Sequence, residues 1–228
     1  MASAWPTFPS AMETNNYACL CRLLVEVGWQ ALRDTFDKIH PPTDLHDVLM
    51  RPPARPILQS LKQERVLSTP QWRKLYPIIT SSLSSGGFDM LLLILLLKNI
   101  CSLNPPSTGW DSLPPAEDTG IAANISRVIY YRNKIYELHA SQGFVDDTTF
   151  NTMWRDISNA LVGLGAGAID WNAINQLKTE SMDPEFFEHY QDLLEQWKRD
   201  DDNIKDKCEE MKSMNIINCY SIDRKSVV

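Results

Sequence analysis

An unbroken apolar run, MLLLILLL at residues 90–97, limits what this chain can fold into more than any other feature. Asp89 precedes the run and Lys98 follows it. A membrane-spanning helix needs about 20 apolar residues, so this run is too short to cross a bilayer. A helix that is apolar on every side must be surrounded by other elements. The run therefore predicts a buried helix over residues 88–103 at the centre of a helical bundle.

Prolines, glycines and capping residues divide the rest of the chain into further helices. A long first helix is expected over residues 16–39, because apolar side chains recur there at helical spacing and two prolines follow. Asp118 and Thr119 stand where side chains can cap the start of one helix, and Asp146 or Asp147 stands where it can cap another. A glycine-rich segment at 163–167 is expected to end a helix. The other expected helices cover residues 44–50, 57–65, 69–76, 120–139, 148–162, 170–182 and 185–214.

These elements predict an all-α protein with one main bundle. The chain has 228 residues, of which 43% are apolar, and both values suit one folded domain with a tail. Residues 1–14 are expected to form a flexible N-terminus, and residues 15–167 the bundle. Residues 168–214 are expected to form a helical acidic extension, followed by a tail at 215–228.

Cysteine usage and the N-terminal sequence indicate the cellular compartment. The five cysteines are odd in number and form no C-x-x-C pair, which argues against a zinc site. The N-terminus has no basic segment followed by an apolar stretch, so a secretion signal is not expected. We therefore expect a cytoplasmic protein with reduced thiols, without a metal, a cofactor or a membrane partner.

The net charge of −7 is unevenly distributed along the chain. Residues 1–139 contain 13 lysines and arginines against 12 acidic residues, whereas residues 140–228 contain 9 against 17. Broad, salt-driven binding of nucleic acid depends on many basic contacts to phosphates. The charge pattern argues against such binding, and any RNA site must be local.

One face of the helix expected at 120–139 combines apolar and polar residues. The step from Arg132 to His139 is seven residues, close to two full helical turns, so both side chains project from the same face. A core helix would place leucine or isoleucine at these positions, because a buried guanidinium without partners is costly. This face, the seam, consists of Ile121, Ile125, Val128, Arg132, Ile135 and His139.

Two interpretations of the seam remain open at this stage. In the structural one, Arg132 pairs with a carboxylate and His139 forms a hydrogen bond at the helix end, where its charge suits the helix dipole. In the functional one, the two residues form a site for chemistry on RNA. Local positive charge and access to solvent around the seam distinguish the two, because an RNA cleft needs both.

The residues around the seam resemble a known motif. Tyr130, Tyr131, Arg132 and Asn133 are followed after five more residues by His139, which resembles the R-x(4–6)-H motif of HEPN domains. The segments GWQALRDTFDKIHPP and IYYRNKIYELHAS more closely resemble the HEPN domain of the DAZ-interacting, zinc-finger ubiquitin-ligase type. This likeness covers about two-thirds of the chain. The cysteine spacing cannot build that ligase's RING finger, so ligase activity is not expected.

The resemblance implies a helical bundle that commonly dimerises and, in active members, cuts RNA without a metal. It implies His139 as general acid or base, Arg132 as the group that stabilises charge on the phosphorane, and Asn133 as an orienting or phosphate-holding group. The expected partners are RNA, a second copy of the chain and other protein modules of a larger architecture. The expected RNA-contacting residues are Arg127, Tyr131, Lys134 and Tyr136.

A second function from another class also fits the sequence. The chain could be a protein interaction module that assembles a larger innate-sensing or signalling protein, without catalysis. In that case Arg132 and His139 would be vestigial. RNA binding, with cleavage as a narrower possibility, is the first hypothesis.

Overall fold

The computed structural model describes residues 11–141, 144–165, 169–179, 188–190, 192–193, 195–196 and 199. All regular elements in these ranges are helices, which confirms the all-α prediction. The expected tail and most of the expected acidic helix lie outside the described residues. So do residues 1–10 of the expected flexible N-terminus.

The chain divides into two compact units, and the predicted bundle of residues 15–167 includes parts of both. The first unit comprises Met1–Asp34 and Asn104–Glu195. The second comprises Thr35–Leu103 and Gln196–Val228. Each unit is described by itself.

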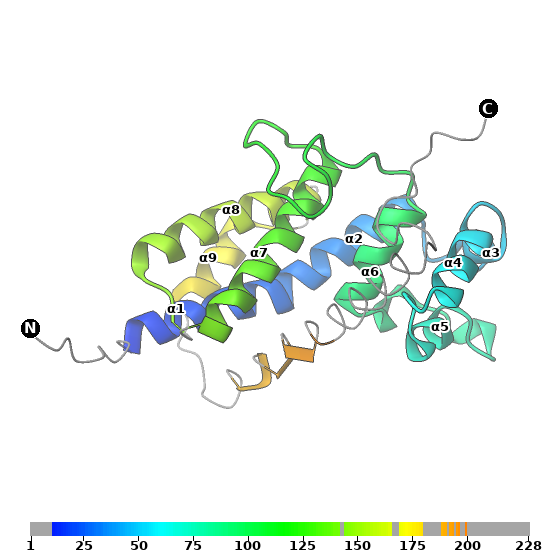
Figure 1. Cartoon of the computed structure of the whole chain (residues 1–228), viewed down its shortest axis with the longest axis horizontal. Helices are drawn as coiled ribbons and strands as arrows, with labels where there is room; N and C mark the ends of the chain where they lie inside the picture. Colours follow the sequence, from blue (N-terminus) through cyan, green and yellow to red (C-terminus); the bar gives the residue numbers. More distant parts are fainter. Residues whose placement is uncertain are drawn as a thin grey trace, which may run out of the picture. The chain divides into compact units, whose positions relative to one another are not determined.

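The first unit is built around two long helices, α7 (Ile121–Ser141) and α8 (Asp147–Gly165), which run side by side (Figure 1). Helix α1 (Ala11–Arg22) packs against both of them and against α9 (Trp171–Thr179). Because α9 contacts α1 and α8, the start of the expected C-terminal extension packs on this bundle.

The predicted first helix is helical over its whole length but not uniformly so. It begins at Ala11, earlier than expected, and contains a π-helical segment, η1 (Leu23–Gly28), before α2 (Trp29–Ile39). A regular 3.6-residue pattern cannot predict this wider turn. Glu26 of the π segment accepts a hydrogen bond from the hydroxyl of Tyr190, a buried residue of the expected last helix. Burial and this bond raise the pKa of Tyr190 to about 12.

The predicted capping aspartates define the helix starts of the first unit. The Oδ1 of Asp118 accepts a hydrogen bond from the backbone N–H of Gly120, just before α7. The Oδ1 of Asp146 accepts from the N–H groups of Thr148 and Thr149 at the start of α8, and its bonds with Thr149 lower its pKa. The glycine-rich segment ends α8 at Gly165, slightly later than expected.

The second unit contains three short helices, α3 (Leu45–Met50), α4 (Ala54–Gln63) and α5 (Thr69–Leu75). Two 3-10 turns, Thr80–Ser82 and Ser85–Gly87, follow them. Helix α4 begins earlier than expected because Pro53 is its N-cap and Pro56 lies in its first turn, where proline is tolerated. Helix α5 begins at a complete capping box of Ser68 and Gln71.

The apolar run forms α6 (Met90–Asn99), the last helix in the Thr35–Leu103 stretch of the second unit. Every side chain from Met90 to Leu97 is buried, which confirms the predicted core helix. Asp89 caps it by accepting a hydrogen bond from the N–H of Leu92 at 2.8 Å. The helix ends earlier than the expected residue 103, and Ser102 just beyond it has a left-handed φ of 55°. No helix in the described ranges is long and apolar enough to span a membrane.

The cysteines that the structure describes are buried and free. They are Cys19, Cys21 and Cys101. Burial raises the pKa of the Cys21 and Cys101 thiols to about 12, so these groups stay protonated at neutral pH.

Candidate functional site

The seam of α7 is buried within the single chain. Ile125, Val128 and Ile135 are each 0% exposed, and among the seam residues whose side chains the structure describes, only Ile121 at the start of the helix reaches solvent substantially. A second copy of the chain is therefore not needed to cover these apolar side chains. The spacing argument correctly placed these residues on one buried face.

Arg132 lies in this buried stretch and is 6% exposed. Its Nε and Nη2 both donate to the Oδ1 of Asn133, at 3.1 and 2.9 Å. Asn133 is half-buried, and these two bonds orient the guanidinium. His139 follows two turns later in α7, and its side chain lies outside the described part of the structure.

A second cation, Arg127, is buried on another face of α7 and is 8% exposed. Its Nη1 donates to the Oδ1 of Asn124 at 2.9 Å, and its Nη2 donates to the backbone carbonyl of Pro115. Both acceptors are neutral, and Arg127 forms no ion pair with any described residue. A buried guanidinium held by neutral oxygens keeps its full charge, and this favours an anion beside it.

Tyr131, one turn after Arg127, links α7 to α8. Its hydroxyl donates to the Oδ2 of Asp156 at 2.7 Å, and its ring packs edge-on against Tyr130 at 5.3 Å between centroids. Burial, followed by the bond to Asp156, raises the pKa of Tyr131. The other oxygen of Asp156 accepts from Arg155 at 3.2 Å. Both oxygens of this carboxylate therefore already have donors.

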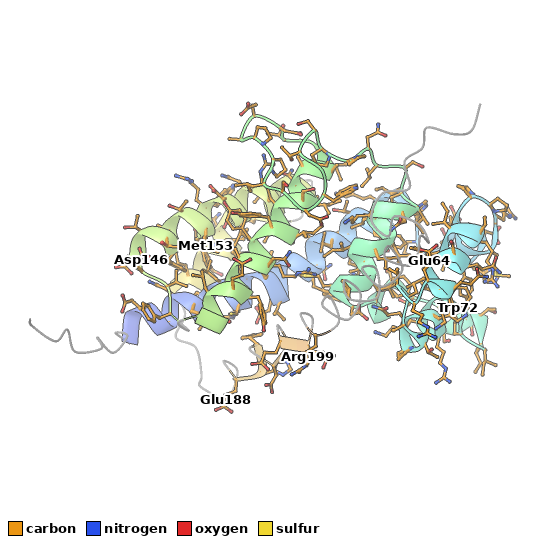
Figure 2. All side chains as sticks on the ribbon, in the orientation of Figure 1. Glu64, Trp72, Asp146, Met153, Glu188 and Arg199 are labelled. Carbon is orange, nitrogen blue, oxygen red and sulfur yellow. The ribbon has the colours of Figure 1, made fainter. Side chains whose placement is uncertain are left out.

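Arg127, Tyr131 and Asp156 line an open cleft of about 490 Å³. One wall is α7, the second is α8, and the third is the loop that precedes α7. Figure 2 labels Asp146, which immediately precedes α8, and Met153 within this helix. The lining residues are Leu113, Pro114, Ala116, Thr119, Asn124, Arg127, Tyr131, Asp156, Asn159, Ala160, Val162 and Gly163.

The other predicted RNA-contacting residues lie outside this cleft. Lys134 is exposed, and its Nζ pairs with the Oε2 of Glu137 at 3.2 Å. Tyr136 is half-buried. The structure thus brings together Arg127 and Tyr131 in the cleft, and separately Arg132 and Asn133 at the seam.

Sequence reasoning missed the cleft residues that do not belong to the motif. Asn124 lies three residues before Arg127, so helical spacing alone signals that the two side chains meet. Asp156 and Asn159 belong to α8, and Pro115 to a loop, so their approach to α7 depends on packing between elements. Nothing in local sequence spacing signals that approach.

Gly163 on α8 allows α7 to come close, and we predict that Gly163→Ala destabilises the protein. A Cβ at this position would overlap the Nδ2 of Asn124, a buried side chain that also holds Arg127. Overpacking of this kind costs about 1–3 kcal/mol, more than the gain of about 0.5–1 kcal/mol expected from alanine in a helix. Urea unfolding measures the difference. Gly87→Ala is the matched control, because a Cβ there meets nothing within 4 Å.

Comparison with known proteins agrees with this all-helical architecture. Residues 42–190 match the family described as DZIP3/hRUL138-like HEPN. The chain therefore belongs to this family of HEPN domains, which confirms the predicted resemblance.

Two relatives are similar to most of this chain. E3 ubiquitin-protein ligase DZIP3 of Mus musculus is 27% identical over 173 residues, and the protein of the same name from Homo sapiens is 26% identical over 174 residues. Each match covers 75% of this chain but 14% of the relative, so the chain spans only a small part of these proteins. No solved structure matches the chain.

Proposed function

We propose that this HEPN module binds single-stranded RNA at α7. The observation that carries the proposal is the buried Arg127, whose charge is held by two neutral oxygens at the wall of an open cleft. Both terminal nitrogens of Arg127 already donate to these oxygens, so its buried charge attracts a phosphate electrostatically, and the surrounding protein strengthens that attraction. Such a site attracts an anion locally even in a chain with a net charge of −7.

The size and lining of the cleft favour a flexible strand over a duplex. A space of about 490 Å³ admits one nucleotide but not a double helix. Thr119 and Asn159 offer hydrogen-bonding groups beside the apolar wall formed by residues such as Leu113 and Val162. Sequence-tolerant recognition of single strands combines a local positive charge with contacts to individual bases.

The narrower proposal is metal-independent cleavage by the motif at the seam. The seam lies on another face of α7 from the cleft and Arg132 is buried, so cleavage requires the seam to open to RNA. His139 would take the proton of the ribose 2′-hydroxyl, whose oxygen attacks phosphorus while the bond to the 5′-oxygen breaks. The leaving 5′-oxygen gains a proton from water, and His139 returns its proton to solvent. Arg132, oriented by Asn133, would stabilise the charge that develops on the phosphorane. Imidazole suits this transfer because its ordinary pKa is about 6.5.

Asn159→Glu tests binding without removing any structural contact. Asn159 is exposed and lines the cleft, so an added carboxylate should repel phosphate while the fold is kept. We expect the affinity for a fluorescein-labelled single-stranded RNA to fall about fivefold or more at low salt, as measured by fluorescence anisotropy.

Thr152→Glu is the matched control for this experiment. Thr152 is also exposed on α8, does not line the cleft, and lies about 10 Å from Asn159 along the helix. Its affinity should stay within about twofold of the parent chain, because solvent screens charges over that distance. An equal loss in both variants would show a general charge effect, and no binding by the parent chain would refute the proposal.

A further inference from the structure

The second unit exposes a group of apolar side chains that its own fold leaves uncovered. Ile78 is fully exposed, Ile79 is 67% exposed and Met50 is 48% exposed. Single exposed apolar residues are common in proteins, but a group of them beside a hollow marks an interaction site. Met50 lines a groove of about 220 Å³ between α3 and the segment that follows α5, and Ile78 and Ile79 lie in the chain between two other lining residues, Pro77 and Thr80.

The groove has firm apolar walls. Leu49, Met50, Leu75 and Leu83 line it together with Tyr76 and Arg55. The hydroxyl of Tyr76 donates to the backbone carbonyl of Leu49 at 2.9 Å, which ties the end of α5 to α3. This bond fixes two walls of the groove relative to each other.

Arg55 makes one edge of the groove positive. Its guanidinium carbon lies 4.1 Å from the Tyr76 ring centroid and 5.4 Å from that of Trp72, the α5 residue marked in Figure 2. Stacking on aromatic rings orients the guanidinium but leaves its charge without a counter-ion. Arg55 forms no ion pair among the described residues.

The surrounding segment carries positive charge although the chain as a whole is acidic. Residues 45–89 contain six lysines and arginines against three acidic residues. Asp47, the carboxylate next to the groove residue His46, is already engaged by Arg51 at 2.8 Å. The groove therefore combines an apolar floor with a basic edge.

We propose that this groove docks an acidic peptide segment of a partner protein. An apolar side chain of the segment would enter the hollow and cover Ile78 and Ile79, while a neighbouring carboxylate would pair with Arg55. Charge complementarity selects an acidic segment, because the carboxylate supplies the counter-ion that Arg55 lacks within the described part of the chain. The apolar rim favours a peptide over RNA, since isoleucine side chains offer nothing to phosphates, and Arg55 already stacks on the rings of Trp72 and Tyr76.

A matched pair of peptides tests the proposal on the full chain. The probe is a fluorescein-labelled amphipathic peptide of glutamate and leucine, and its partner is the same peptide with lysine in place of glutamate. We expect the acidic peptide to bind with a dissociation constant on the order of 10 μM, and the lysine peptide at least about tenfold more weakly. Ile78→Asp and Ile79→Asp should each weaken binding of the acidic peptide at least about fivefold.

Ile121→Asp is the control, because Ile121 is also exposed but lies in the first unit. Ile121 is the first residue of α7, where an aspartate interacts favourably with the helix dipole and should not disturb the fold. It should bind the acidic peptide like the parent chain. Equal binding of both peptides, or equal effects of all three substitutions, would overturn the proposal. A concentration-dependent dimer in sedimentation that Ile78→Asp abolishes would assign the groove to a second copy instead. Weaker RNA binding by Ile79→Asp would assign it to nucleic acid.

Discussion

Arg127→Met is expected to lower the free energy of unfolding by about 1–3 kcal/mol, because the buried side chain of Asn124 and the carbonyl of the loop residue Pro115 lose their hydrogen-bond donor. Methionine keeps an unbranched apolar stem of similar length, so the loss reports the guanidinium rather than a cavity. The oxygens concerned are the Oδ1 of Asn124 and the backbone carbonyl of Pro115. The second of these bonds holds the loop before α7 against the helix.

Urea unfolding followed by circular dichroism measures this loss, and Arg155→Met is the control. The Arg155 side chain is 66% exposed and pairs with Asp156 at the surface, so its removal should change stability by less than about 1 kcal/mol. If the free energy of unfolding fell by the same small amount in both variants, Arg127 would not hold the loop before α7 against the helix. A stable Arg127→Met variant that also kept full RNA affinity would remove the cleft from the proposed function.

The helix starts of this fold follow from the sequence because caps act locally. Asp118 and Asp146 accept hydrogen bonds from residues two or three positions further along the chain, so the sequence that encodes each cap also encodes its partner. The buried helix α6 was equally predictable, since eight consecutive apolar residues leave no face for solvent.

The differences in the fold arise where the backbone departs from regular geometry or where distant segments meet. The π-helical turns in η1 do not follow the 3.6-residue period on which the prediction rests. Ser102 adopts a left-handed conformation that serine rarely takes, so the early end of α6 carries no composition signal. The division into two units, each made of separate stretches of chain, depends on long-range contacts.

Of the candidate site, the sequence predicted the residues of the motif on α7 but not the cleft beside them. Helical spacing placed Arg132 on the same face as Ile125 and Ile135, and all three side chains are buried. The cleft could not be foreseen, because its carboxylate and its loop wall come from Asp156 and Pro115, distant in sequence from the motif. The motif identified the helix, whereas packing created the hollow beside it.

Cleavage of single-stranded RNA by the purified chain, in the presence of a metal chelator, is the most direct test of whether α7 acts on RNA. A denaturing gel follows the cleavage, and RNA binding is measured on the same samples. His139→Ala should keep the fold and reduce cleavage by about 10²–10⁴-fold, because it removes the group that transfers the proton. Arg132→Ala should reduce cleavage. It should also lower the free energy of unfolding by about 1–3 kcal/mol, because the Oδ1 of Asn133 loses its two hydrogen bonds from the guanidinium.

His46→Ala and His189→Ala are the controls, since both histidines are exposed and lie outside α7. We predict cleavage by the parent chain and by both controls in the presence of chelator, and its loss in His139→Ala with binding retained. A parent chain that neither binds nor cuts several single-stranded RNAs, or a His139→Ala variant that cuts at the parent rate, would contradict the assignment of RNA chemistry to α7.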